Sequence, residues 1–197
     1  MIFSTGQIAM ESGEINQFPF RDNGFSSAQE MAAIPGTMID VAVRLLHENT
    51  GNILDLGCGN GLLVAAIASR LPGVTPIGVE CVRDRANRGR ATLERTGGRL
   101  YVGDMFSQEQ PWFGQQPYLL TILMIGRLLE VGVQLRQALI RDLKRHTNLL
   151  LLYTYGDPLS MSEVATQLLS SAFPGAIQMA GVEDGSLPRI WVPPHRT

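Results

Sequence analysis

Acidic residues stand at the ends of apolar segments, and the first of them precedes a turn rich in glycine. Asp55 interrupts the apolar run 53–56 and is followed by Gly57, Gly59 and Gly61. Glycine lets the backbone approach a ligand closely, and the first turn of a following helix offers it free N–H groups. This strand–turn–helix pattern is therefore typical of a site for a nucleotide-like ligand.

The glycine spacing and the position of the acid distinguish between two nucleotide cofactors. A dinucleotide site follows G-x-G-x-x-G, whose third glycine would fall at Leu62, whereas this chain reads G-x-G-x-G. The Asp55 carboxylate would repel a pyrophosphate but would attract a cationic or ammonium-bearing ligand. The pattern thus favours S-adenosylmethionine over NAD, and an NAD dehydrogenase is a distant alternative.

The segment Leu54 to Gly61, reading LDLGCGNG, resembles the first motif of the class I S-adenosylmethionine-dependent methyltransferases. Two later segments fit the same family. One ends in Glu80, about twenty residues past the glycine turn, and the other contains Gly103-Asp104. The specific motifs lie between Asp55 and Asp104, while the resemblance in topology runs from about Asn52 to the C-terminus.

The resemblance implies a role for each acid. Asp55 would reach the methionine ammonium of the cofactor, directly or through water, and Glu80 would accept hydrogen bonds from both ribose hydroxyls. Asp104 would accept from the adenine amino group, and the N–H of Met105 would face a ring nitrogen. The cofactor-binding residues expected on this basis are Asp55, Gly57, Cys58, Gly59, Gly61, Glu80, Cys81, Asp104, Met105 and Met124.

The catalytic candidates are Tyr153, Tyr155 and Arg127, at the ends of the fourth and fifth predicted strands. Methyl transfer is an in-line displacement that needs alignment, exclusion of water and sometimes removal of a proton. The two tyrosines point to one side of their strand, where they could line the acceptor pocket, position a proton or pack at the core edge. Arg127 could hold a carboxylate or phosphate of the substrate, or pair with Glu130 on the surface.

The acceptor class is inferred from the segment after the fourth strand. It reads Met124-Ile125-Gly126-Arg127, so the Asn/Asp-Pro-Pro-Tyr signature of amine-methylating nucleic-acid and glutamine enzymes is absent. We therefore expect a small-molecule substrate and no nucleic-acid partner. Three alternatives stay open: a protein methyltransferase of the lysine type, a same-fold enzyme that cyclises or cleaves S-adenosylmethionine, and a non-enzymatic cofactor-binding partner subunit.

The predicted helix after Glu80 is rich in arginine, with Arg83, Arg85, Arg88 and Arg90. Such a run could contact nucleic acid or an acidic partner. We interpret it as a solvated helix face, because no aromatic residues interleave with the arginines and the net charge of the chain is −2.

From Asn52 onward, apolar runs alternate with helical patterns, which predicts a parallel sheet covered on both faces. The expected fold is α/β, a three-layer Rossmann-like sandwich with a seven-stranded, mostly parallel sheet, an antiparallel last strand and an N-terminal helical arm. Strands are expected at 52–56, 75–80, 99–103, 118–125, 148–154, 176–182 and 188–192, and helices at 61–71, 83–96, 127–144 and 161–173.

Residues 1–50 are expected to form an N-terminal arm with lid helices, and residues 51–197 the S-adenosylmethionine-binding domain, in one compact unit. Residues 1 to about 23 show no firm periodicity. A helix over 26–33 should end at Pro35-Gly36, with Thr37 capping a second helix. The candidate lid residues are Phe25, Ser26, Gln29 and Met38.

The composition fits one globular domain, since 45% of the 197 residues are hydrophobic and 17% are charged. Cys58 and Cys81 are expected to be reduced and buried, and the spacing of Cys and His residues suggests no metal site. No segment reads as a signal peptide or membrane span, so we expect a cytoplasmic protein that is a monomer or homodimer.

Overall fold

The computed structural model describes residues 20–23, 28–107, 110–114, 117–154, 158–180 and 189–192. Within these ranges the strands form a seven-stranded sheet in the order β3-β2-β1-β4-β5-β7-β6. Strands β1 to β5 pair in parallel, and β7 runs antiparallel to both β5 and β6. The bounds are β1 (Gly51–Leu56), β2 (Val74–Glu80), β3 (Arg99–Val102), β4 (Tyr118–Met124), β5 (Thr147–Thr154), β6 (Ile177–Ala180) and β7 (Arg189–Val192).

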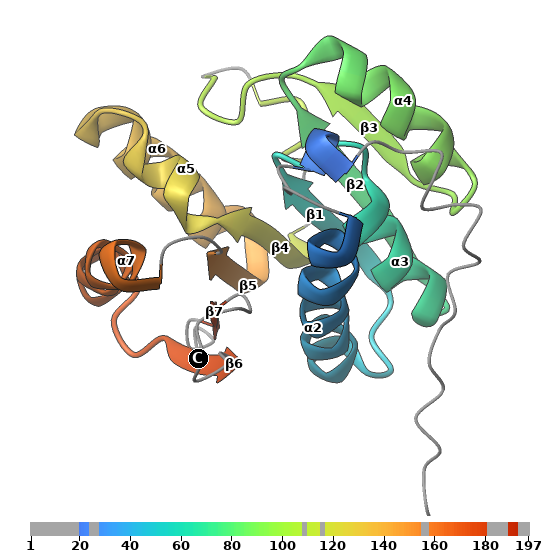
Figure 1. Ribbon diagram of the computed structural model, residues 1–197. Helices are drawn as coiled ribbons and strands as arrows, with labels where there is room; N and C mark the ends of the chain where they lie inside the picture. The colour runs from blue at the N-terminus through green and yellow to red at the C-terminus, as the bar shows by residue number, and fades with distance from the viewer. Residues whose placement is uncertain are drawn as a thin grey trace, which may run out of the picture.

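Helices lie on both sides of the sheet, so the predicted Rossmann-like α/β fold with parallel strands is confirmed (Figure 1). A 3-10 helix, η1 (Phe20–Asn23), precedes them. One hydrophobic core holds residues of α2 (Ala28–Leu46), α3 (Leu62–Arg70) and α4 (Arg83–Glu94). A second core holds residues of α5 (Ile125–Leu129), α6 (Val133–His146) and α7 (Pro158–Ala172).

Alternation along the strands separates these two cores. In β1, Ile53 belongs to the core shared with α2 and α3, whereas Leu54 and Leu56 belong to the core shared with α6 and α7. Successive strand residues point to opposite faces. Asp55 therefore faces the α2–α3 side of the sheet, together with Ile53, and any ligand that touches its carboxylate lies on that side.

Pro35 does not end a helix, so the predicted break at Pro35-Gly36 and the cap at Thr37 are wrong. Helix α2 passes through all three positions. An internal proline removes one helical hydrogen bond and crowds the preceding turn, at a cost of about 3 kcal/mol. Met38 and Val41 are 1% and 0% exposed, and burying each such side chain contributes about 1.5–3 kcal/mol. Core packing of α2 thus offsets the local preference.

The predicted helix over 127–144 is two helices, because the chain breaks between α5 and α6. Gly132 has the extended conformation of an N-cap residue, with φ −62° and ψ 156°. The Arg136 side chain donates to the carbonyl oxygens of Leu128 at 2.6 Å and Val131 at 3.1 Å. The carbonyls left without helical partners at the end of α5 are therefore satisfied by a side chain from the next helix.

Candidate functional site

Two buried carboxylates lie at neighbouring strand ends. Asp55 in β1 is level with Gly78 in β2, and Glu80 closes β2 beside Val102 of β3. Asp55 is 2% exposed and Glu80 is 4% exposed. Open α/β sheets bind ligands at the carboxyl ends of their strands, so this pair occupies the expected edge of the sheet.

The environment of Asp55 disfavours its charged form. Burial, and then the negative charge of Glu80, raise the pKa of Asp55 from 3.8 to about 7. A positively charged group placed beside Asp55 would favour ionisation and lower this pKa again. The site is therefore built to gain from a cationic ligand more than from a neutral one.

Glu80 holds the glycine turn against the end of β2. One carboxylate oxygen accepts from the N–H of Gly59 at 3.0 Å, and the other accepts from the N–H of Val82 at 2.7 Å. The Cys81 thiol donates to this second oxygen at 3.6 Å. Sequence reasoning assigned Glu80 to the ligand and missed this internal role. Each carboxylate oxygen has two lone pairs, so the oxygen that bonds Gly59 can still accept one hydrogen bond from a ligand hydroxyl.

Gly59 and Gly61 lie so close to other parts of the protein that a side chain at either position would clash with them. Both have left-handed backbones, with φ of 58° and 74°. A Cβ on Gly61 would lie 2.0 Å from Cδ1 of Leu93 in α4, and one on Gly59 would lie 2.5 Å from Oδ1 of Asn23 in η1. These two glycines therefore allow close packing of η1 and α4, a role that sequence reasoning did not predict.

Gly57 differs from the other two glycines, because it borders open space. Its φ is 82°, and an added Cβ would meet only the terminal Cε of Met105, at 3.2 Å. A pocket opens beside it with about 620 Å³ of empty space, part of it open to solvent. Gly57 is thus the glycine of the turn that a ligand can approach.

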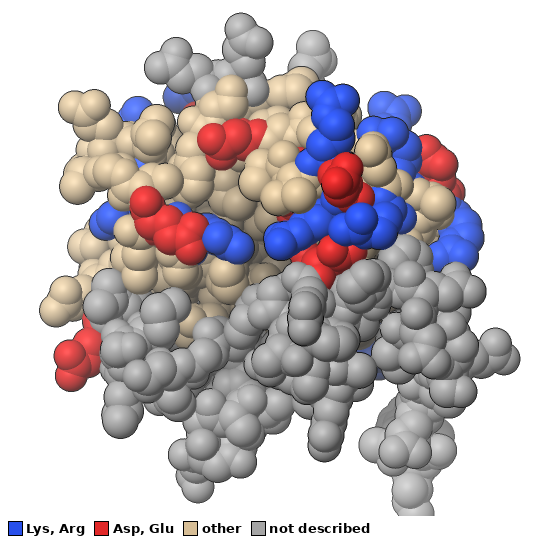
Figure 2. Space-filling view, turned by 45° about the horizontal axis from the view of Figure 1, so that its top comes forward, with Lys and Arg blue, Asp and Glu red and all other residues tan. Residues whose placement is uncertain are grey.

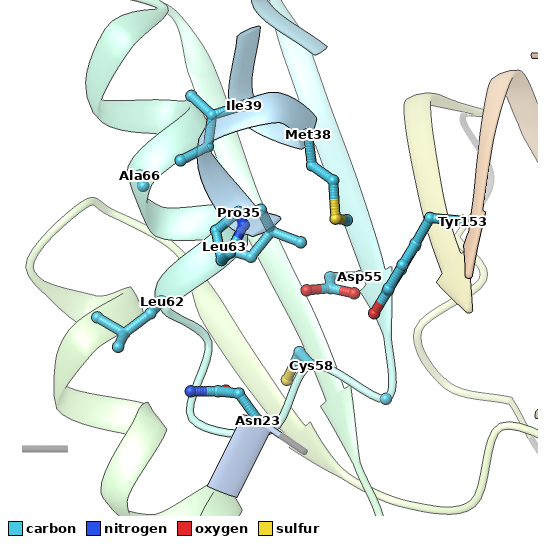
Figure 3. A pocket seen from close by; sticks show the side chains of 11 residues that line it. Asn23, Pro35, Met38, Ile39, Asp55, Cys58, Leu62, Leu63, Ala66 and Tyr153 are labelled. Carbon is cyan, nitrogen blue, oxygen red and sulfur yellow. The ribbon is translucent and has the colours of Figure 1, made fainter. Parts of the chain in front are cut away.

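The pocket combines one carboxylate with mostly apolar walls (Figure 3). The Asp55 carboxylate lies between Met38 of α2 and Tyr153 of β5, whose phenol oxygen points toward it. The remaining lining comes from Asn23, Pro35, Ile39, Gly57, Cys58, Leu62, Leu63 and Ala66. Such a wall suits a ligand with one positive charge and an apolar body.

Other predicted cofactor residues lie outside this pocket. Asp104 is exposed, and one of its oxygens accepts from the N–H of Phe106 at 3.0 Å in the turn after β3. Both cysteines are free: Cys58 is buried, as predicted, but Cys81 is exposed, so its predicted burial is wrong. Cys81 directly follows Glu80, where β2 has ended.

The three candidate catalytic residues differ in their positions relative to the pocket. Tyr153 is half-buried and pairs across the β4–β5 ladder with Met124, which is half-buried as well. Arg127 donates to both oxygens of Glu130, at 3.1 and 2.9 Å, which is the surface pair that the sequence left open. Tyr155 lies outside the described residues, as do the lid candidates Phe25 and Ser26.

Helix η1 was not anticipated, because residues up to 23 carry no periodic signal. Asp22 is buried, and its carboxylate accepts two hydrogen bonds from Arg88, each at 2.7 Å. Asn23 accepts from the N–H of Asn60 at 3.2 Å. The prediction that the arginine helix is a solvated face is therefore wrong for Arg88, because this residue joins η1 to α4. A contact across 66 positions leaves no local trace in one sequence.

The residues that the structure describes contain no group of three or more His, Cys, Asp or Glu that could hold a metal ion. In the same part of the chain, no helix has the length and apolar character needed to span a membrane.

Comparison of the sequence with known proteins gives relatives but no family model. The chain is 32% identical over 117 residues, 56% of its length, to the ribosomal RNA small subunit methyltransferase C of Klebsiella pneumoniae. It is 30% identical over the same length to the protein of that name from Salmonella paratyphi B. The matched segment covers 33% of the length of each of these curated relatives.

Solved structures share the fold. The N-terminal domain of EvdMO1 with S-adenosylhomocysteine bound superposes with a TM-score of 0.61 at 16% identity, covering 82% of this chain and 81% of that one. The methyltransferase domain of bacterial CtHen1-C superposes with a TM-score of 0.57 at 16% identity, covering 80% and 94%. The fold, the order of the motifs and the sequence match thus agree with the predicted resemblance to the class I S-adenosylmethionine-dependent methyltransferases.

Proposed function

We propose that this chain binds S-adenosylmethionine at the ends of β1 to β3 and transfers its methyl group to an acceptor. The observation that carries the proposal is the buried pair Asp55 and Glu80 beside Gly57. S-adenosylmethionine carries two positively charged groups, an ammonium and a sulfonium. A positive charge beside Asp55 lowers the free-energy cost of ionising this buried carboxyl group. The names of the sequence relatives support the same reaction class.

The residues at this edge fit the parts of the cofactor in the order that the family resemblance implies. Asp55 would hold the methionine ammonium, and Glu80 would accept from a ribose hydroxyl with the remaining lone pair of the oxygen that bonds Gly59. Asp104 would accept from the adenine amino group, beside Met105, whose side chain approaches Gly57. Gly57 and Cys58 line the pocket, and Met124 lies one strand away from Tyr153.

The bound cofactor supplies the methyl group and its sulfonium leaving group. The chain contributes orientation and a site with little water. Asp55 fixes the charged end, and the apolar side chains of Leu62, Leu63 and Ile39 exclude water from the pocket. Tyr153 is the described candidate best placed to orient an acceptor, because it lines the same pocket as Asp55. Arg127 would first have to leave Glu130.

We propose a small-molecule acceptor as the leading case. The pocket is lined mainly by apolar side chains, including Pro35 and Met38 of α2, which overhang the strand ends. The apolar residues Met124 and Ile125 stand where β4 ends and α5 begins, so these two positions offer no amide or carboxylate to an amine acceptor. A compact acceptor that enters beside Tyr153 fits these walls.

An RNA acceptor is the second candidate. The sequence relatives are named as ribosomal RNA methyltransferases. In addition, α4 exposes Arg83 and Arg90, and Figure 2 shows basic side chains gathered on this part of the surface with acidic ones between them. Interspersed acids weaken the attraction of such a surface for a phosphate backbone, so RNA ranks second.

Calorimetric titration of the purified protein with S-adenosylmethionine and S-adenosylhomocysteine tests cofactor binding. We expect saturable binding to the wild type, weakened binding to Asp55→Asn, and wild-type binding to Glu94→Gln, which removes an exposed charge at the end of α4. If neither ligand binds to the wild-type protein, the proposed function is wrong.

Transfer itself is tested with methyl-labelled cofactor. Incubation with cofactor alone should leave it intact, whereas release of methylthioadenosine would indicate cleavage or cyclisation in place of methyl transfer. Label should then be followed into three fractions of a cell extract: small molecules, RNA and protein. Label in the small-molecule fraction supports the leading case, label in RNA supports the second, and label in protein refutes both acceptor assignments.

A further inference from the structure

Helix η1 places a side chain over the glycine turn and into the wall of the pocket. Asn23 lines the pocket together with Gly57 and Cys58. Its Oδ1 accepts from the N–H of Asn60 at 3.2 Å, and it lies so near Gly59 that a Cβ there would approach within 2.5 Å. The position of η1 therefore sets the shape of one side of the pocket.

A partly buried ion pair ties η1 to α4. The Asp22 side chain is 9% exposed, and both of its oxygens accept from the Arg88 guanidinium at 2.7 Å, in the two-pronged geometry that gives strong, directional pairing. The Arg88 side chain is 43% exposed. Removing Arg88 would leave a carboxylate shielded from water without its cation, which is a costly arrangement.

The pair reaches the pocket through one residue. Asp22 precedes Asn23 directly, and the backbone oxygen of Asp22 would lie 2.6 Å from a Cβ on Gly59. A shift of Asp22 must therefore move Asn23, since adjacent residues of a helical turn are linked by rigid peptide geometry. Arg88 is not among the residues that line the pocket, so its effect on a ligand is indirect, and the contacts of Asp22 and Asn23 provide a route through η1.

We infer that Arg88 is a positioning residue that holds η1 over the glycine turn and so closes one side of the cofactor pocket. The inference about closure concerns the protein without ligand. Its consequence for the cofactor rests on the proposed function. Arg88, which the sequence analysis placed on a solvated face, thus contributes to ligand retention through Asp22 and Asn23.

Cys58 provides a direct readout of closure, because it lines the pocket beside Asn23 and is 5% exposed. We would label the protein with N-ethylmaleimide and follow the Cys58 and Cys81 peptides by mass spectrometry. Cys81 is exposed and serves as the internal reference. We expect Arg88→Ala to label Cys58 at least about tenfold faster than the wild type. The matched variant Arg90→Ala, on the same helix, should label at the wild-type rate.

A double variant separates closure from overall stability. In Asp22→Ala with Arg88→Ala, no buried charge is left without a partner, so the urea midpoint should return toward the wild-type value. Cys58 labelling should nevertheless stay fast, because η1 has lost its link to α4. Slow labelling of Cys58 in this double variant, or equal rates in Arg88→Ala and Arg90→Ala, would overturn the inference.

Release of S-adenosylhomocysteine, measured by stopped flow, tests the consequence for the ligand. We expect Arg88→Ala to release it at least about tenfold faster than wild type and Arg90→Ala. Tighter binding in Arg88→Ala would mean that η1 obstructs the pocket, which overturns the positioning role. If the wild type binds no S-adenosylhomocysteine but the labelling results hold, the proposed function fails while the closure by Arg88 stands.

Discussion

Replacing Asp55 with asparagine should stabilise the protein without ligand at neutral and alkaline pH. The pKa of Asp55 rises from 3.8 to about 7 in the folded chain. Between these two values the folded state keeps a proton that the unfolded chain has released, so stability falls as the pH rises. A shift of this size corresponds to about 4 kcal/mol at 1.36 kcal/mol per pKa unit. Relaxation around the buried charge lowers this value, and we expect about 2–4 kcal/mol.

Urea unfolding of wild type and Asp55→Asn near pH 5 and near pH 8 measures this difference directly. Asparagine is neutral throughout, and the contributions of all other groups cancel in the comparison. The advantage of the variant should therefore be about two- to threefold larger near pH 8 than near pH 5. The same advantage at both pH values would show that Asp55 titrates normally, and the electrostatic description of the site would be wrong.

The affinity for the cofactor should also depend on the ionisation of Asp55, but it should rise with pH where the stability of the ligand-free protein falls. A bound cation favours ionised Asp55, so affinity for S-adenosylmethionine should rise up to about tenfold per pH unit between about pH 5.5 and 7. In this range the ligand ammonium stays protonated. The affinity of Asp55→Asn should be flat with pH and lower than wild type near pH 7.5. Equal affinities there would place the positive charge of the ligand away from Asp55.

Three further substitutions test separate parts of the site. Gly59→Ala should displace Asn23, whose Oδ1 would lie 2.5 Å from the new Cβ, and should speed Cys58 labelling; unchanged labelling would refute this packing role. Glu80→Gln should destabilise the chain by about 1–3 kcal/mol in urea unfolding, because an amide cannot accept at both former carboxylate oxygens. Arg136→Ala should cost about 1–2 kcal/mol through lost carbonyl partners but leave cofactor affinity unchanged; a lowered affinity would contradict a purely structural role.

Sequence patterns predicted the sheet because its strands are marked locally. The expected strands 52–56 and 75–80 begin within one residue of β1 and β2 and end where these strands end, since burial on both faces leaves a continuous apolar run. Helix boundaries were less accurate. The break before α6 depends on Arg136 reaching back to Val131, and no helical periodicity records such a contact.

The site was predictable where the chemistry is local and unpredictable where it depends on distant partners. Asp55 beside the glycine turn could be read as a cation-attracting carboxylate because both features lie within a few residues. The roles of Gly59 and Arg88 could not, since both depend on η1, which comes from a segment without hydrophobic periodicity. In each case the missing information is a contact between positions far apart in the chain.

These contacts change how the glycine turn is best understood. Of its three glycines, only Gly57 faces open space, while Gly59 and Gly61 admit η1 and α4. Glu80, at the end of β2, also holds the turn in place by accepting a hydrogen bond from the N–H of Gly59. The turn is therefore held on two sides before any ligand arrives, which reduces the ordering cost of binding. A preformed turn with one open glycine and one protonated, buried acid is suited to a ligand that brings its own positive charge.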